Sequence, residues 1–337
     1  MEKILTIIIP SYNMEEFISQ SLNSLLIPSL NDVEILVIND GSKDKTSELA
    51  NTYALKYHDS IRVIDKENGH YGSCVNRGLQ EARGKYVKIL DADDSFDSDG
   101  FEGFVRFLKG VNVDMVFSNY CIVNEKGSVT SEVKYPKPLH SGNMSFDEAL
   151  PLINHRTIAM HAITYRLELL KSINYKQTEG VIYTDKEWDF MPLLHVKTVA
   201  AFPHCVYKYL VGRDGQSTSS EVAIKFENLS FELLLHRIDY FNQFKFNLSS
   251  SKIKVALDQL GLGISVIYYR DILRLSYKKA QEGLRNFDAK LKKISPEVYD
   301  YLNYVKLWKC VPYIRLWRDN NKFSLIVLNL VRKLIYK

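Results

Sequence analysis

Cysteine is scarce in this chain of 337 residues, which has four cysteines far apart and no C-x-x-C pair. A zinc site or a disulfide framework is therefore not expected, and a reducing cytosol suits the composition. Long apolar runs are also missing, because no stretch reaches the roughly 18–20 apolar residues that a membrane-spanning helix needs. The first apolar run is broken by Pro10 and lacks a small-residue cleavage site, which favours a first strand over a signal peptide. A cytoplasmic protein is expected, with peripheral contact to the inner face of the membrane as an extension.

The glycine motifs of two common nucleotide-binding folds are absent as well. The sequence has neither G-x-G-x-x-G nor G-x-x-x-x-G-K-[ST]. If the chain binds a nucleotide, a metal ion is the natural counter-charge for the phosphates, and carboxylates would have to hold it.

Composition is otherwise that of a globular protein, with 46% hydrophobic and 25% charged residues. This suits one large or two small domains. The net charge of +4 is concentrated in residues 301–337, which hold eight Lys or Arg and one acid. This basic tail interleaves aromatic residues with cations, a pattern that suits an anionic membrane surface. An oligomer contact, or packing on the rest of the chain, is the alternative.

Apolar and helical patterns alternate along the first 120 residues. The expected strands are residues 4–9, 33–38, 61–64, 86–90 and 113–117. The expected helices are residues 14–26, 45–57, 73–82 and 101–108. The alternation predicts β-α-β units, and so an α/β fold with a Rossmann-like, mainly parallel sheet flanked by helices. Helical spacing further along predicts a helical C-terminal region over 221–337.

Polar segments follow each of the first four expected strands. They are PSYN (10–13), NDGSKD (39–44), DKENGHYG (65–72) and DAD (91–93). Ligands of parallel sheets bind beyond the carboxyl ends of the strands. Four polar segments at the same edge of the predicted sheet favour a binding site over a set of solvated turns.

The segment after the fourth expected strand carries the highest density of charge. Five aspartates lie within nine positions, at Asp91, Asp93, Asp94, Asp97 and Asp99. A solvated turn and a calcium loop are alternatives, but an EF-hand needs glycine where Phe96 stands and a helix where a strand is expected. A D-x-D site, in which carboxylates hold Mg²⁺ or Mn²⁺ on nucleotide phosphates, agrees with the polar segments that follow the other three strands.

Four segments in order, IIIPSYNMEEFISQSLNSLL, VEILVINDGSKDKT, ENGHYGSCVNRGL and GKYVKILDADD, resemble the inverting family 2 glycosyltransferases of GT-A fold. The resemblance covers roughly residues 1–215 and is most specific over the first 120. It implies a catalytic domain at 1–220, with 1–120 binding a nucleotide sugar and 121–220 facing the acceptor. The helical region with its basic aromatic tail then occupies 221–337.

The resemblance assigns a set of residues to the nucleoside-diphosphate sugar donor. They are Pro10, Ser11, Tyr12, Asn13, Asp40, Asn68, Gly69, Asn76, Asp91, Ala92 and Arg213. Asp40 would read the base, because a carboxylate accepts from the ring N–H of uracil or thymine, which cytosine lacks. Asp93 would hold the Mn²⁺ or Mg²⁺. One departure from the family is that Cys74-Val-Asn-Arg77-Gly replaces A-R-N-x-G, which displaces the arginine.

The second half supplies the acceptor side by the same resemblance. Asp185 in VIYTDKEWDF is the expected base that takes a proton from the acceptor hydroxyl, with Glu187 as the alternative. His161, Glu187 and Trp188 are the expected acceptor contacts. Arg213, in the expected closing loop VGRDGQSTS, would stabilise the charge of the leaving diphosphate.

The sequence therefore predicts a metal-dependent, inverting glycosyltransferase. Its donor would be a nucleoside-diphosphate sugar, with UDP favoured, and its acceptor a glycan or a polyprenyl-linked glycan in polysaccharide synthesis. Nucleic acid is not an expected partner. The alternatives are a non-catalytic carbohydrate- or membrane-binding protein on the same scaffold, and a sugar-phosphate nucleotidyltransferase. The latter would need a glycine-rich basic loop where PSYN stands.

Overall fold

The computed structural model describes residues 3–153, 158–181, 184–213, 227–273, 278–306 and 310–319, and the single residues 326 and 330. Internal contacts divide the chain into two compact units, residues 1–230 and 231–337.

The first unit is built on one large mixed sheet. Its strands are β1 (Leu5–Ser11), β2 (Val33–Asn39), β3 (Ile61–Asp65), β4 (Tyr86–Ile89), β5 (Ser95–Phe96), β6 (Met115–Val123), β7 (Val129–Val133), β8 (Met144–Ser145), β9 (Ile163–Arg166) and β10 (Thr198–Leu210). Their order is β3-β2-β1-β4-β9-β6-β10-β5, with β7 on β6 and β8 on β10. Strands β1 to β4 pair in parallel, as predicted.

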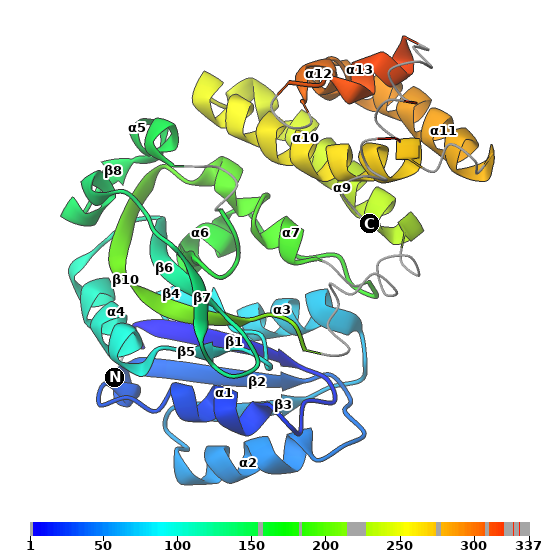
Figure 1. Cartoon of the computed structure of the whole chain (residues 1–337). Coiled ribbons are helices and arrows are strands. Elements are labelled where there is room, and N and C mark those ends of the chain that lie inside the picture. Colours follow the sequence, from blue (N-terminus) through cyan, green and yellow to red (C-terminus); the bar gives the residue numbers. More distant parts are fainter. Residues whose placement is uncertain are drawn as a thin grey trace. The chain divides into compact units, whose positions relative to one another are not determined.

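The helices of this unit cover the sheet. They are α1 (Ile18–Ser24), α2 (Thr46–Lys56), α3 (His70–Glu81), α4 (Ser98–Gly110), α5 (Phe146–Ala149), α6 (Leu167–Ser172) and α7 (Asp185–Trp188). Figure 1 shows α1 and α2 together below strands β1 to β3, and α3 on the other side of these strands. Coverage on both faces explains why β1 and β2 are continuous apolar runs that are buried throughout.

Helix α3 approaches the sheet closely because small residues face it. A Cβ atom on Gly78 would lie 2.6 Å from Cγ2 of Ile8, which is on β1. A Cβ on Gly72 would lie 2.1 Å from the carbonyl oxygen of Thr178. The two glycines therefore let α3 pack tightly against β1 and against the segment that leads to α7.

The second half of the sheet departs from the simple parallel pattern. Strand β9 lies antiparallel between β4 and β6, although it follows both in the sequence. The strand expected at 113–117 is longer and lies at Met115–Val123, and the helix expected at 14–26 is confined to Ile18–Ser24. Strand β9 thereby brings residues from beyond position 160 next to the strand that precedes the aspartates.

The second unit is helical. Its helices are α9 (Glu227–Phe244), α10 (Ser250–Leu273), α11 (Lys278–Ile294), α12 (Pro296–Tyr301) and α13 (Tyr313–Arg318). Every third or fourth residue of α11 is buried, at Leu284, Phe287 and Leu291, while its exposed face is mostly basic. Such spacing is that of a helix packed by one face.

Part of the basic aromatic tail is packed within this unit. The hydroxyl of Tyr313 donates to the carbonyl of Ser265 at 2.5 Å. The indole of Trp317 donates to Oε1 of Gln281 at 3.1 Å, and Arg318 Nη2 lies 2.7 Å from Asp288 Oδ1. Tyr304 is 75% exposed. Trp308 and Tyr336 lie outside the described residues.

Among the described residues, none of the helices combines the length and the apolar character that crossing a membrane requires.

Candidate active site

An acidic cluster lies at the carboxyl end of β4. Asp91, Asp93 and Asp94 each offer a carboxylate oxygen, and these oxygens lie within 4.8 Å of one another. Burial, together with the charge of Asp93, raises the pKa of Asp91 to about 7. Three carboxylates this close are costly in the absence of positive charge, so the site favours a cation.

Asp91 and Asp94 are tied to neighbouring tyrosines. The hydroxyl of Tyr71 donates to Asp91 Oδ1 at 2.8 Å. The hydroxyl of Tyr207 donates to Asp94 Oδ2 at 2.6 Å, and the backbone N–H of Leu210 donates to Asp94 Oδ1 at 2.7 Å. Asp94 therefore joins the acidic loop to β10.

Asp93 faces a different partner. Arg213, just beyond the end of β10, lies with Nε and Nη2 at 2.8 and 2.6 Å from Asp93 Oδ2. The guanidinium also lies 4.9 Å from the ring centre of Phe17. The rest of the expected closing loop, residues 214–219, lies outside the described residues.

The cluster suits a hard divalent cation in its donor atoms. Mg²⁺ and Mn²⁺ take oxygen ligands, usually one or two carboxylates plus substrate phosphates. Both oxygens of Asp94 are bonded, by Tyr207 and Leu210. Tyr71 bonds one oxygen of Asp91, and Arg213 bonds one oxygen of Asp93.

The end of β1 forms the first expected donor loop. Ser11 is the last residue of the strand, and Tyr12 follows with 46% of its surface exposed. Asn13 adopts a positive φ of 52°, and its Oδ1 accepts from the backbone N–H of Lys43 at 2.8 Å. The loops after β1 and β2 are thus joined, with an aromatic ring exposed between them.

Asp40 follows β2 and is almost completely buried. Its Oδ1 accepts from Nζ of Lys66 at 2.6 Å and from the backbone N–H of Gly69 at 2.9 Å. Its carbonyl accepts from the side chain of Asn68 at 3.0 Å. The structure therefore brings Asn68 and Gly69, two of the residues expected at the donor, to Asp40, and adds a lysine.

Asn76 and Arg77 both point to protein partners. The amide of Asn76 donates to the carbonyl of Gln177 at 2.9 Å and accepts from its N–H at 2.8 Å. Arg77 pairs with Glu81 one turn along α3, at the surface. Asn76 thus anchors the segment before α7, and this arrangement does not favour the contact with the donor that the sequence predicts for Asn76. Arg77, the displaced arginine, is paired with Glu81 and does not favour a donor contact either.

Asp185, the expected base, begins α7. It lies 3.2 Å from Nζ of Lys186, which also lies 2.9 Å from Asp189. The two carboxylates raise the pKa of Lys186, so this lysine stays charged. The charge of Asp185 also contributes to the raised pKa of Asp91, which places the expected base within electrostatic reach of the acidic cluster.

Glu187 and Trp188 are buried completely. Glu187 accepts from the backbone N–H and the hydroxyl of Thr178, both at 2.7 Å. The ring of Trp188 packs edge-on against Tyr165 and Tyr175. Their positions are those of core residues that hold α7 in place, and they do not favour the expected acceptor contact.

His161 lies among aromatic rings. Its ring centre is 4.2 Å from that of Tyr209 and 4.9 Å from that of Tyr207. Burial lowers the pKa of His161 to about 3, so the ring is neutral at physiological pH. Its Nδ1 has no hydrogen-bond partner among the described residues.

A buried lysine lies below this group. Lys88 on β4 donates to the carbonyls of His161 and Ile163 at 2.7 and 3.2 Å. Its side chain is completely buried, and desolvation lowers its pKa to about 7. Lys88 therefore fixes the segment that carries His161 against the strand that ends at the aspartates.

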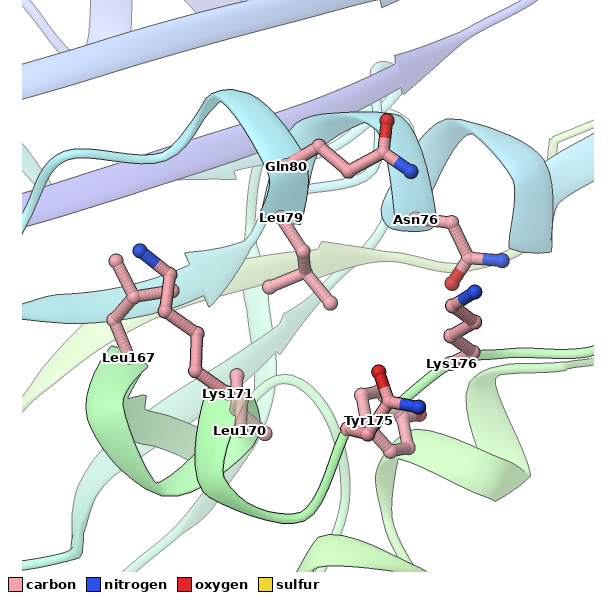
Figure 2. A pocket seen from close by; sticks show the side chains of 9 residues that line it. Asn76, Leu79, Gln80, Leu167, Leu170, Lys171, Tyr175 and Lys176 are labelled. Atoms are coloured by element: carbon pink, nitrogen blue, oxygen red, sulfur yellow. The ribbon is translucent and has the colours of Figure 1, made fainter.

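A separate pocket of about 210 Å³ lies between α3 and α6. Figure 2 shows Leu79 and Gln80 entering it from α3, and Leu170 and Lys171 from α6. Of the expected site residues only Asn76 lines it.

Sequence reasoning did not single out Tyr71, Tyr207, Lys66 or Lys88. Lys66 carried a signal, because it directly follows an expected strand at the edge where the other polar segments gather. Tyr207 had none, since its place beside Asp94 depends on the pairing of β10 with β5 and β6.

The fold resembles that of a solved protein, S. aureus TarS. Residues 1–349 of S. aureus TarS, in a crystal structure with UDP-GlcNAc, superpose with a TM-score of 0.55 at 19% identity, covering 86% of this chain and 91% of that one. This likeness shows the fold and confirms the expected GT-A architecture followed by a helical region.

Sequence comparison gives the family. The sequence model of glycosyl transferase family 2 matches residues 6–172. The chain is 39% identical over 116 residues to the uncharacterized glycosyltransferase EpsJ of Bacillus subtilis, covering 34% of this chain and 33% of that protein. It is 31% identical over 223 residues to the uncharacterized glycosyltransferase RT0329 of Rickettsia typhi, covering 64% of this chain and 66% of that protein. The chain belongs to glycosyltransferase family 2. It spans about a third of the length of EpsJ.

Proposed function

We propose that this chain is a metal-dependent, inverting glycosyltransferase. In this proposal, it moves a sugar from a nucleoside-diphosphate donor, with UDP favoured, to a hydroxyl of a glycan or lipid-linked glycan. The observation that carries the proposal is the meeting of four strand ends. An exposed tyrosine, a buried carboxylate, an acidic cluster and an arginine all lie at one edge of the sheet, at Tyr12, Asp40, Asp91–Asp94 and Arg213. TarS, which has a similar fold, is solved with UDP-GlcNAc.

Each part of the donor has a matching group in the protein. Tyr12 offers a stacking face to the base, and Asp40 offers an acceptor to its ring N–H. Asp91 would accept from the ribose, and Asp93 would hold the Mn²⁺ or Mg²⁺ at the diphosphate. A bound divalent cation supplies positive charge to the leaving group, and Arg213 supplies a second positive charge from the end of β10.

Asp185 is the proposed base. Its carboxylate takes the proton of the acceptor hydroxyl, and the acceptor oxygen forms a bond to C1 of the sugar as the bond from C1 to the diphosphate oxygen breaks. The nucleoside diphosphate leaves with the bonding electron pair. A single displacement from the opposite face inverts C1, so an α-linked donor gives a β-linked product. Lys186, paired with Asp185, orients the carboxylate.

His161 is proposed to contact the acceptor. Its neutral ring lies half-buried within electrostatic reach of Asp185, and its Nδ1 is unpartnered among the described residues. Neutral imidazole can donate or accept, which suits a sugar hydroxyl.

Peripheral membrane contact through the basic tail is also proposed, with a narrower set of residues than the sequence suggests. Because Tyr313, Trp317 and Arg318 are packed on helices α10 and α11, the contact is proposed for the remaining cations of the tail, which include the exposed Lys306 and Arg315. Replacing Lys306 and Arg315 by glutamine should weaken cosedimentation with anionic vesicles and leave the thermal midpoint unchanged, because both side chains are exposed.

A thermal-shift panel tests the donor site. UDP, dTDP, GDP and CMP are each added with Mn²⁺ or with EDTA, to the wild type and to Asp93→Ala. A ligand that binds only the folded state raises the midpoint. We expect a shift with UDP and Mn²⁺ that is lost with EDTA and in the variant. The absence of a shift with any nucleotide would contradict the proposed function.

A further inference from the structure

The carboxylate expected to read the base is paired with a lysine. Lys66 Nζ lies 2.6 Å from Asp40 Oδ1, and their side chains are 18% and 4% exposed. Lys66 follows β3 directly, and its backbone N–H donates to the carbonyl of Asn39 at 3.0 Å. The lysine is therefore fixed at the same strand edge as the carboxylate.

Neighbouring residues hold the ammonium in this position. Lys66 Nζ also donates to Oγ of Ser73 at 2.8 Å and to the carbonyl of Glu67 at 2.5 Å. A Cβ atom on Gly69 would lie 2.7 Å from Ser73 Oγ and 3.2 Å from Lys66 Nζ. Glycine at position 69 therefore keeps space open for the lysine beside Asp40.

One of the three hydrogen bonds of the ammonium can be exchanged. The bond to the carbonyl of Glu67 is at the surface. When a ligand oxygen replaces this carbonyl as the acceptor from Lys66, water can bond the carbonyl instead. The neighbouring thiol of Cys74 does not compete, because burial raises its pKa to about 12 and keeps it neutral. Lys66 is thus a charged donor next to the acceptor on Asp40.

We propose that Lys66 determines base specificity together with Asp40, by donating to the carbonyl beside the ring N–H that Asp40 accepts. This inference rests on the proposed function, since it requires a nucleotide at this edge. Uracil and thymine present N3–H beside O4, and guanine presents N1–H beside O6. Each of these bases meets an acceptor with its N–H and a charged donor with its carbonyl.

Cytosine is mismatched twice in the same register. Its N3 is an acceptor that faces the carboxylate, and its amino group is a donor that faces the ammonium. Leaving polar groups opposed is more costly than losing a bond. The pair therefore selects bases with an N–H next to a carbonyl and discriminates against cytosine more strongly than a carboxylate alone would.

The test is calorimetric titration of UDP, GDP and CDP, each with Mn²⁺, into the whole chain. Lys66→Met removes the ammonium and keeps the stem, and Lys43→Met is the matched control, because Lys43 is an exposed lysine of the same strand edge. We expect the wild type to bind UDP at least tenfold more tightly than CDP. Lys66→Met should lose about ten- to a hundredfold in UDP affinity, which is the loss of a charge-assisted hydrogen bond. Its UDP-to-CDP ratio should fall to within about threefold, while Lys43→Met stays like the wild type.

A second variant guards against a loss of folding. Asp40→Asn keeps Lys66 and can turn its amide toward the N3 of cytosine, so its affinity ratio should move toward CDP. If Lys66→Met lowers the affinities for UDP and CDP by the same factor, or lowers neither, the specificity role of Lys66 is overturned and the proposed function still stands. A wild type that binds none of the three nucleotides would overturn both.

Discussion

Arg213 and Asp93 form an ion pair in which one carboxylate oxygen, Oδ2, is 2.8 Å from Nε and 2.6 Å from Nη2 of the guanidinium. The oxygen that this pair occupies belongs to the residue proposed as the metal ligand. If Asp93 holds a cation as proposed, that cation and the arginine would compete for Asp93 until a diphosphate binds and attracts both.

Replacing Arg213 by glutamine should separate these two effects. Mn²⁺ affinity in the absence of nucleotide should rise about three- to tenfold, because a partly exposed ion pair no longer competes. Turnover should fall about a hundredfold, because the leaving diphosphate loses a donor. Electron paramagnetic resonance of free Mn²⁺ and a steady-state transfer assay measure the two quantities.

The matched control for this variant is Lys208→Gln, on the strand that ends just before Arg213. Lys208 pairs with Asp97 at 2.8 Å, outside the acidic cluster. An increase in Mn²⁺ affinity in both variants would mean a general charge effect and would rule out local competition at Asp93.

Asp185→Asn should abolish transfer and spare the donor. The loss of a general base costs about 10²- to 10⁴-fold in rate, whereas the affinity for UDP with Mn²⁺ should stay within about twofold. Transfer rates and calorimetric UDP binding are measured on the same preparation. Asp189→Asn is the comparison, because Asp189 shares Lys186 but is almost completely buried. A variant at Asp185 that retains full transfer would remove it from the role of base.

Gly72→Ala should destabilise the fold next to the site without removing any proposed ligand contact. The new Cβ would collide with the carbonyl of Thr178, whose N–H and hydroxyl hold Glu187 on α7. We expect a loss of about 1–3 kcal/mol in the free energy of unfolding, as is usual for overpacking. Gly110→Ala is the control, since nothing lies within 4 Å of a Cβ there. Urea denaturation compares the three proteins, and equal stability of both variants would contradict the tight packing of α3.

Lys88 should give the fold a pH dependence of definite sign. Its pKa is about 7 in the folded chain and lowered from 10.5 by burial, so the unfolded state binds one more proton between these values. The free energy of unfolding should therefore rise with pH from 7 to about 9, by about 1 kcal/mol per pH unit. Below pH 7 the lysine is charged in both states and its contribution is constant.

Urea denaturation at pH 7, 8 and 9 measures this slope. Lys88→Met should flatten it, whereas the exposed Lys56→Met should reproduce the wild type. An unchanged slope in Lys88→Met would show that other groups cause the dependence.

The sequence predicts the first half of the fold well because each of its elements has a local signal. Apolar runs of β-branched residues such as Leu5–Ser11 and Val33–Asn39 are strands in any position that buries both faces. The polar segments after them gather because parallel strands end at one edge. The second half lacks such rules, since strand β9 enters the sheet between two earlier strands.

The same distinction applies to the site. Asp91, Asp93 and Asp40 could be predicted because they follow strands, and the structure brings them to one edge together with Asn68 and Gly69. The sequence offers Glu187 as the alternative base and as an acceptor contact, yet in the structure it is buried and bonded to Thr178. A sequence pattern places a carboxylate on a helix but does not tell which side of that helix faces the core.

The bonds from Tyr207 and Leu210 to Asp94 have a consequence for how mutational data on this chain should be read. A saturation screen scored by activity would rank Tyr207 with the residues that contact substrate, since losing its hydroxyl frees the acidic loop from β10. Only an assay that separates catalytic rate from ligand affinity would tell such anchors from contacts. The sensitivity of a residue at this site to substitution thus reports the hydrogen bonds that hold the loops together as much as the contacts with a ligand.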